Sequence, residues 1–189
     1  ASRSGGLIEF ELAIQTGRRA SFAAAGELWP QRRLDALDRF GELYPADFLA
    51  QAMLLEAALL RHDLGRVDEA LPDLRRVVEI DPQAPAAQDA AELLLSILRD
   101  RRQWGDLADT LDEFLAIEEL GNDAFRAGLI DTRERTAFKM IEERHIGSED
   151  WEGAAEAYQR FSEDYPDSPL ADRALYNAIV WQCRRTADH

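Results

Sequence analysis

Cysteine and lysine are nearly absent from this sequence of 189 residues, in which Cys183 and Lys139 are the single examples. One cysteine cannot form an intramolecular disulfide, and it excludes a zinc site built from cysteine ligands. The sequence therefore leaves the redox compartment open. The simplest interpretation of Cys183 is a small hydrophobic residue buried in the core.

Long apolar segments are also missing. The most apolar stretch, residues 52–60, is short and contains Glu56, so no membrane-spanning helix is predicted in this chain. The first residues, ASRSGG, lack the basic and then apolar layout of a signal peptide.

Positive charge is scarce. The chain has 22 Lys and Arg against 37 Asp and Glu, which gives a formal net charge of −15 and a pI near 4.6. Such a surface repels phosphate backbones, so nucleic acid is excluded as a partner. The hydrophobic fraction of 46% is too high for a disordered chain.

Arrangements of residues that perform catalysis or hold a cofactor are absent as well. The three histidines are far apart and lack zinc-ligand spacing, and the glycines match no phosphate-binding loop. The acidic residues at 106, 109, 112 and 113 lack the glycine and glutamate of a calcium loop and lie on a helical pattern. The sequence predicts no catalytic activity, no cofactor and no metal site.

What the sequence does contain is helical periodicity. Apolar residues recur at spacings of three and four, and glycines and prolines separate these blocks. Strand alternation and hairpin turns are nearly absent. The pattern predicts an all-α fold of about nine helices, over residues 7–27, 31–43, 47–63, 67–80, 86–102, 105–118, 123–146, 151–164 and 169–185.

The ends of several helices resemble one another. Residues 39–45 read RFGELYP, residues 76–82 read RVVEIDP and residues 160–166 read RFSEDYP, while residues 113–119 fit the same frame without the proline. Pro82 follows Pro45 by 37 residues, Glu119 follows Pro82 by 37, and Pro166 follows after another 47. A near-constant period of this size indicates a helical repeat array, in which each unit buries its apolar face against the next.

The repeated units resemble the tetratricopeptide repeat. Residues 51–84 carry the resemblance best, with Leu54, Ala57, Ala58, Gly65, Ala70, Leu74, Val77 and Pro82 at its large, small and turn positions. Arg61 departs from the pattern, because that position is usually aromatic. The fourth unit supplies Trp151, Ala154, Tyr158, Phe161 and Pro166, and the third supplies Trp104, Leu107, Leu111 and Phe114. The segment YPDSPLADRALYN is also similar to repeat proteins of the bacterial periplasm and outer membrane.

This resemblance implies antiparallel helical hairpins stacked into a right-handed α-solenoid. We expect a single domain over residues 1–189, with units near 7–45, 46–84, 85–120 and 121–166 and a partial or capping unit at 167–189. The last period is about ten residues longer than the others. The insertion near residues 121–131 either lengthens a helix or divides the array, and the sequence leaves both alternatives open.

The resemblance also implies a function, a noncatalytic module that binds a partner peptide or helix on its concave face. The residues expected to line that face are Leu55, Leu59, His62, Asp89, Glu92, Ser96, Arg99, Lys139, Glu143, Arg173 and Tyr176. Their acidic character favours a partner with a basic segment. The alternative is a scaffold segment of a larger bacterial envelope or motility assembly. The bacterial envelope is favoured over the cytoplasm, and apolar residues of the last helix indicate self-association.

Overall fold

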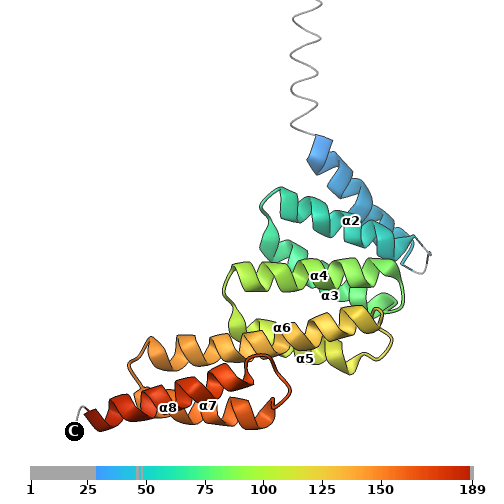
Figure 1. Ribbon diagram of the computed structural model, residues 1–189. Helices are drawn as coiled ribbons and strands as arrows, with labels where there is room; N and C mark the ends of the chain where they lie inside the picture. Colours follow the sequence, from blue (N-terminus) through green and yellow to red (C-terminus); the bar gives the residue numbers. More distant parts are fainter. Residues whose placement is uncertain (1–28, 46, 48, 188–189) are drawn as a thin grey trace, which may run out of the picture. The chain divides into compact units, whose positions relative to one another are not determined.

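The structure is a computed structural model that describes residues 29–187 except 46 and 48, with side chains as far as Cys183 (Figure 1). All regular elements in this range are helices, and it contains no strand, which confirms the predicted all-α fold. The predicted helix 7–27 lies outside the described residues. The elements are a helix over residues 29–43, α2 (Ala50–Asp63), α3 (Val67–Ile80), α4 (Pro85–Asp100), α5 (Trp104–Ala116), α6 (Asp123–Ile141), the π-helical turn η1 (Glu142–Ile146), α7 (Trp151–Asp164) and α8 (Ala171–Ala187).

The turn between the two helices of a hairpin has the same backbone geometry three times. Gly65, Arg102 and Glu149 all have a left-handed backbone, with φ of 75°, 56° and 57°. The amide after each of them donates to the carbonyl five residues back, at 2.8 Å for Arg66 and 2.9 Å for both Gln103 and Asp150. This is the Schellman arrangement that closes a helix and satisfies its last carbonyls. The three turns are 37 and 47 residues apart, which confirms the period.

The connection from one hairpin to the next also recurs. The amides of Asp47, Ala84 and Ser168 donate to carbonyls three residues back, at 3.1, 3.2 and 3.1 Å. These carbonyls belong to Tyr44, Asp81 and Tyr165, which immediately precede the repeated prolines. The recurring sequence at the helix ends therefore corresponds to a recurring tight turn.

The chain divides into two compact parts, one ending at Asp73 and one starting at Leu74, which are described separately. In the second part α4, α5, α6, α7 and α8 pack against one another in chain order, as in a helical repeat array. In Figure 1, α6 lies in front of α5 and α8 in front of α7. Pro72 is the sixth residue of α3, and the helix continues past it to Ile80.

The core of the second part is aromatic around α7. The Phe138 ring of α6 lies 5.0 Å from the ring of Tyr158 and 5.5 Å from that of Phe161, and all three are buried. Ala174 and Ala178 let α8 pack closely against this cluster. Val77 and Phe114, at the positions equivalent to Phe161, are also buried, as is Leu74 at the position of Tyr158.

Helix α8 carries a tryptophan that packs on α7 and a cysteine that does not. Trp151 and Trp181 stack with ring centroids 4.8 Å apart, which joins α7 to α8 and gives Trp181 a structural role. Cys183 is exposed, so its interpretation as a buried residue was wrong. The reason is that Ala174 and Ala178 turn one face of α8 inward, and Cys183 lies outside that face.

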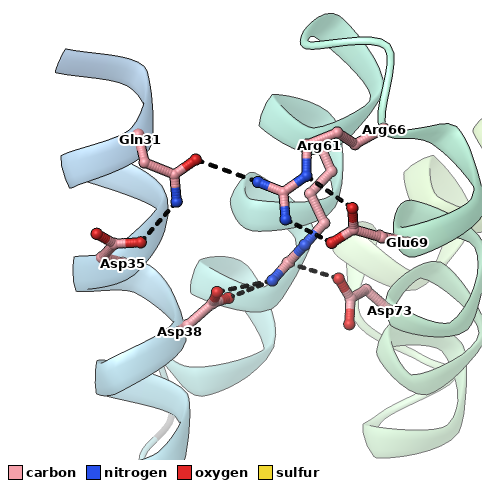
Figure 2. A network of polar contacts seen from close by, with 7 residues as sticks. All are labelled: Gln31, Asp35, Asp38, Arg61, Arg66, Glu69 and Asp73. Atoms are coloured by element: carbon pink, nitrogen blue, oxygen red, sulfur yellow. Dashed lines mark hydrogen bonds and ion pairs between the residues drawn. The ribbon is translucent and has the colours of Figure 1, made fainter. Parts of the chain in front are cut away.

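The first part contains a network of charged residues at the position where the repeat usually has an aromatic residue (Figure 2). Arg61 of α2 binds both carboxylate oxygens of Asp38 at 2.7 Å and one oxygen of Asp73 at 2.6 Å. Its side chain is only 12% exposed. The arginine thus links α2 to α3 and to the helix over residues 29–43, with strong charge-assisted hydrogen bonds.

The insertion of the fourth unit lies in α6. This helix starts at Asp123, where the Asn122 side chain accepts a hydrogen bond from the Phe125 amide at 2.9 Å, and it runs unbroken to Ile141. Arg126 then donates to the carbonyls of Leu115 and Ile117 at the end of α5. The extra residues therefore lengthen a helix, which continues directly into the π-helical turn η1.

Candidate partner-binding surface

The residues expected to bind a partner lie on α2, α4, α6, η1 and α8, and none is fully buried. In the first part Leu59 is exposed, while Leu55 and His62 are half-buried. On α4 the side chains of Asp89, Glu92 and Arg99 are exposed, and the half-buried Ser96 hydroxyl donates to the Leu93 carbonyl at 3.0 Å. Lys139, Glu143, Arg173 and Tyr176 are exposed in the second part.

Lys139 and Arg173 are brought together in one cavity. It has a volume of about 310 Å³ and lies between α6 and the start of α8. Phe138 and Leu170 give it an apolar lining, to which the turn before α8 adds Ser168. Helix α6 and a turn distant in sequence thus form one concave site.

Charges around this cavity are nearly all paired. Arg135 binds Asp131 at 3.0 Å, Lys139 forms a short ion pair with Glu142, and Arg173 approaches Glu142 at 3.9 Å. Glu134 also lines the cavity, and it has no ion pair or side-chain hydrogen bond with any residue that the structure describes. Its carboxylate is therefore available to a ligand.

Arg173 is held over the apolar wall of the cavity. Its guanidinium carbon lies 5.2 Å from the centre of the Phe138 ring. A cation over a ring face is attracted by the ring quadrupole. The contact positions Arg173 at the rim, and its side chain remains 62% exposed.

Of the four expected residues on α6, η1 and α8, two do not line this cavity. Glu143 lines a different cavity together with Arg102, and Tyr176 is not among the residues that line the cavity between α6 and α8. Conversely, Glu134, Phe138 and Leu170 line it and were not among the predicted site residues. For Glu134 and Phe138, the sequence signal is the spacing of Asp131, Glu134, Phe138 and Glu142 on one helical face.

The turn between η1 and α7 is held by the side chain of Asp150. Asp150 accepts a hydrogen bond from the Gly153 amide at 3.0 Å and lies 2.8 Å from His145 Nδ1. The His145 hydrogen bond, together with the amide, holds the pKa of Asp150 below its ordinary range. A Cβ at Gly153 would lie 2.1 Å from the Asp150 carboxylate, so no larger residue fits without rearrangement.

Within the described ranges, no three His, Cys, Asp or Glu side chains gather in an arrangement that would hold a metal ion. Over the same residues, no helix has both the length and the apolar character needed to cross a bilayer.

Residues 134–168 match the family model of the tetratricopeptide repeat. The match covers the second half of α6, η1, α7 and the turn that completes the cavity. It confirms the resemblance to the tetratricopeptide repeat over this segment, and that repeat is a fold that serves in protein–protein interaction and is typically noncatalytic. A search of curated proteins finds no match to the chain.

Proposed function

We propose that the protein binds a segment of a partner protein on the surface formed by α4, α6 and α8, with the cavity between α6 and α8 as the anchoring point. The observation that carries this proposal is the unpaired Glu134 carboxylate beside an apolar lining. Leu55, Leu59 and His62 of α2 are assigned to partner contacts in the first part. The site requires no catalytic group.

The cavity suits an arginine or lysine side chain of the partner. The aliphatic stem packs on Phe138 and Leu170, while the charged end pairs with Glu134. The chain's net charge of −15 attracts a basic segment over a longer range and raises its rate of association. Charge therefore contributes speed and selectivity, and the apolar contact contributes affinity.

The experiment is a titration with fluorescent peptides that contain arginine beside leucine, followed by anisotropy at low and high salt. Glu134→Gln should weaken binding about fivefold, which corresponds to about 1 kcal/mol for a partly exposed ion pair. Glu156→Gln is the matched control, because Glu156 is exposed on α7 and makes the same charge change away from the cavity. Equal losses in both variants, or no dependence on salt, would contradict the proposal.

The alternative, a scaffold segment of a larger assembly, has one supporting observation. Leu175, Tyr176, Ile179 and Val180 form an exposed apolar strip on α8. Such a strip suits contact with another protein or with a second copy of the chain. Sedimentation at increasing concentration tests self-association, and replacing Ile179 with glutamate should abolish any dimer. A strict monomer would remove this alternative in its self-associating form.

A further inference from the structure

A second cavity in the same unit is lined by charged side chains that are mainly positive, whereas the chain as a whole is acidic. It has a volume of about 530 Å³ and lies between the first turn of α5, η1 and α7. Arg102, Arg144 and Arg160 line it, and Glu143 is the one acidic residue among its lining residues. In a chain of net charge −15, three arginines around one cavity are a marked local excess of positive charge.

These arginines are largely available. Arg144 and Arg160 make no side-chain hydrogen bond or ion pair with the part of the chain that the structure describes. Arg102 approaches Glu143 only at 4.0 Å, the outer limit of an ion pair, and its side chain is 78% exposed. Unpaired guanidinium groups in a concave site are suited to bidentate binding of carboxylates.

A buried donor points to the same kind of ligand. Trp104 lines the cavity, and its indole nitrogen is buried with no acceptor within the described residues. The indole N–H is a donor only, and buried donors in folded proteins almost always have an acceptor. The nitrogen is closed to water, so a ligand carboxylate would supply the missing acceptor only after a side-chain shift that opens it to the cavity.

The floor of the cavity is apolar and continues beyond it. Met140, Ile141 and Ala157 line this cavity and also an adjoining one of about 460 Å³. The adjoining cavity has a mixed lining, with Asp109 and Asp164 beside Arg133 and the shared Arg160, so positive charge predominates only in the first cavity. Two adjoining cavities with a shared apolar floor suit a peptide segment better than a small anion.

Neighbouring residues at the end of α6 and in η1 divide between the two cavities, because they lie on different faces of the helix. Glu142 lines the cavity between α6 and α8, whereas the next three residues of η1 line the basic groove. The π-helical turn thus lines both sites, and such turns frequently occur at functional positions.

We propose that this groove binds an acidic segment of a partner protein, with carboxylates at Arg102, Arg144 and Arg160 and apolar side chains over Met140 and Ile141. This is a second binding site, opposite in charge preference to the one proposed above, and it does not depend on that function. An acidic segment and a basic segment could then be held at the same time.

The test is selection of random peptides displayed on phage against the whole chain, with counter-selection against the double variant Arg144→Gln, Arg160→Gln. The peptides lost in counter-selection should be rich in Asp and Glu next to apolar residues. For such a peptide, measured by anisotropy, the double variant should bind at least about tenfold more weakly, as expected for loss of charge-assisted contacts. Arg135→Gln, in the other cavity, is the matched control and should bind normally.

Trp104→Phe removes the buried N–H and keeps an aromatic ring. It should weaken binding of the same peptide severalfold, while the thermal melt followed by circular dichroism stays close to that of the unchanged chain. Two results would overturn the proposal. One is a set of selected peptides without acidic enrichment, or equal binding by both arginine variants. The other is displacement of the peptide by inorganic phosphate at the peptide's own concentration, which would make the occupant a free anion.

Discussion

The same repeat position lies among charged side chains in the α2–α3 hairpin and beside aromatic side chains in the hairpin of α6, η1 and α7. Arg61 and His145 are 84 residues apart, and each stands four residues before the left-handed residue of its turn, Gly65 and Glu149 respectively. Arg61 reaches across to other helices and is bound by two aspartates. His145 binds Asp150 in the adjoining turn, and the helices around it are joined by aromatic packing.

The comparison shows which features of the repeat are fixed and which vary. The small residues Ala70 and Ala154 are fully buried at equivalent places, and the turns share their hydrogen bonds. The large positions differ, because Leu74 and Val77 correspond to Tyr158 and Phe161. The small residues, which let the helices approach closely, are the fixed feature of the repeat. The side chains that fill the space between the helices vary, and they can be aliphatic, aromatic or charged.

The largest expected effect is in the aromatic hairpin. Phe161→Ala removes a ring that packs on Phe138 and should lower the free energy of unfolding by about 3–5 kcal/mol. Chemical denaturation followed by circular dichroism measures this loss. Leu175→Ala on the exposed face of α8 is the control and should change stability by less than about 0.5 kcal/mol. Similar losses for the two variants would mean that Phe161 is not a core residue.

A smaller loss is expected in the ionic hairpin. Arg61→Ala leaves Asp38 and Asp73 without their shared cation and should cost about 2–3 kcal/mol. Arg32→Ala, at an exposed site, should cost less than about 0.5 kcal/mol. Adding Asp38→Asn and Asp73→Asn to Arg61→Leu should recover much of the loss, because no unpaired charge then remains. Failure to recover would show that Arg61 acts through packing instead.

In the turn that the two hairpins share, one substitution is expected to raise the free energy of unfolding. Glu149 has φ of 57°, a left-handed backbone that glycine adopts without steric cost. Glu149→Gly should therefore raise stability by about 0.5–1 kcal/mol, and Gly65→Ala should lower it by a similar amount. Thermal melts of both variants measure the pair. If Glu149→Gly were destabilising, the Glu149 side chain would have to contribute more than its backbone costs.

The smallest expected effect is on the loss of stability at acidic pH. Because the folded pKa of Asp150 lies below its ordinary 3.8, its bonds to His145 and Gly153 stabilise the fold above that value. Their contribution is lost as pH falls through the lowered pKa. Unfolding measured from neutral to strongly acidic pH should therefore show a shallower acid decline in Asp150→Asn, which keeps the acceptor for the Gly153 amide. An unchanged acid profile would contradict this assignment.

Much of the helical organisation was predictable from the sequence, whereas the candidate sites were predictable only in part. Helix spacing, breakers and the repeated ends indicated α3 to α8 because these signals are local. Lys139 and Arg173 were expected on one surface and share a cavity. Glu134 and Leu170 were missed, since their proximity depends on how a turn near residue 168 meets α6. The expected burial of Cys183 was wrong because it depends on which face of α8 packs inward.

The sequence by itself determined the helices, their turns and the period, because backbone propensity and the spacing of small and apolar residues act over a few residues. Tertiary structure decided the partners of Arg61, the separation of Glu142 from Glu143 onto two surfaces, and the gathering of three arginines in an acidic chain. These features depend on side chains meeting across helices, and the packing angle and register of those helices follow from the whole set of contacts.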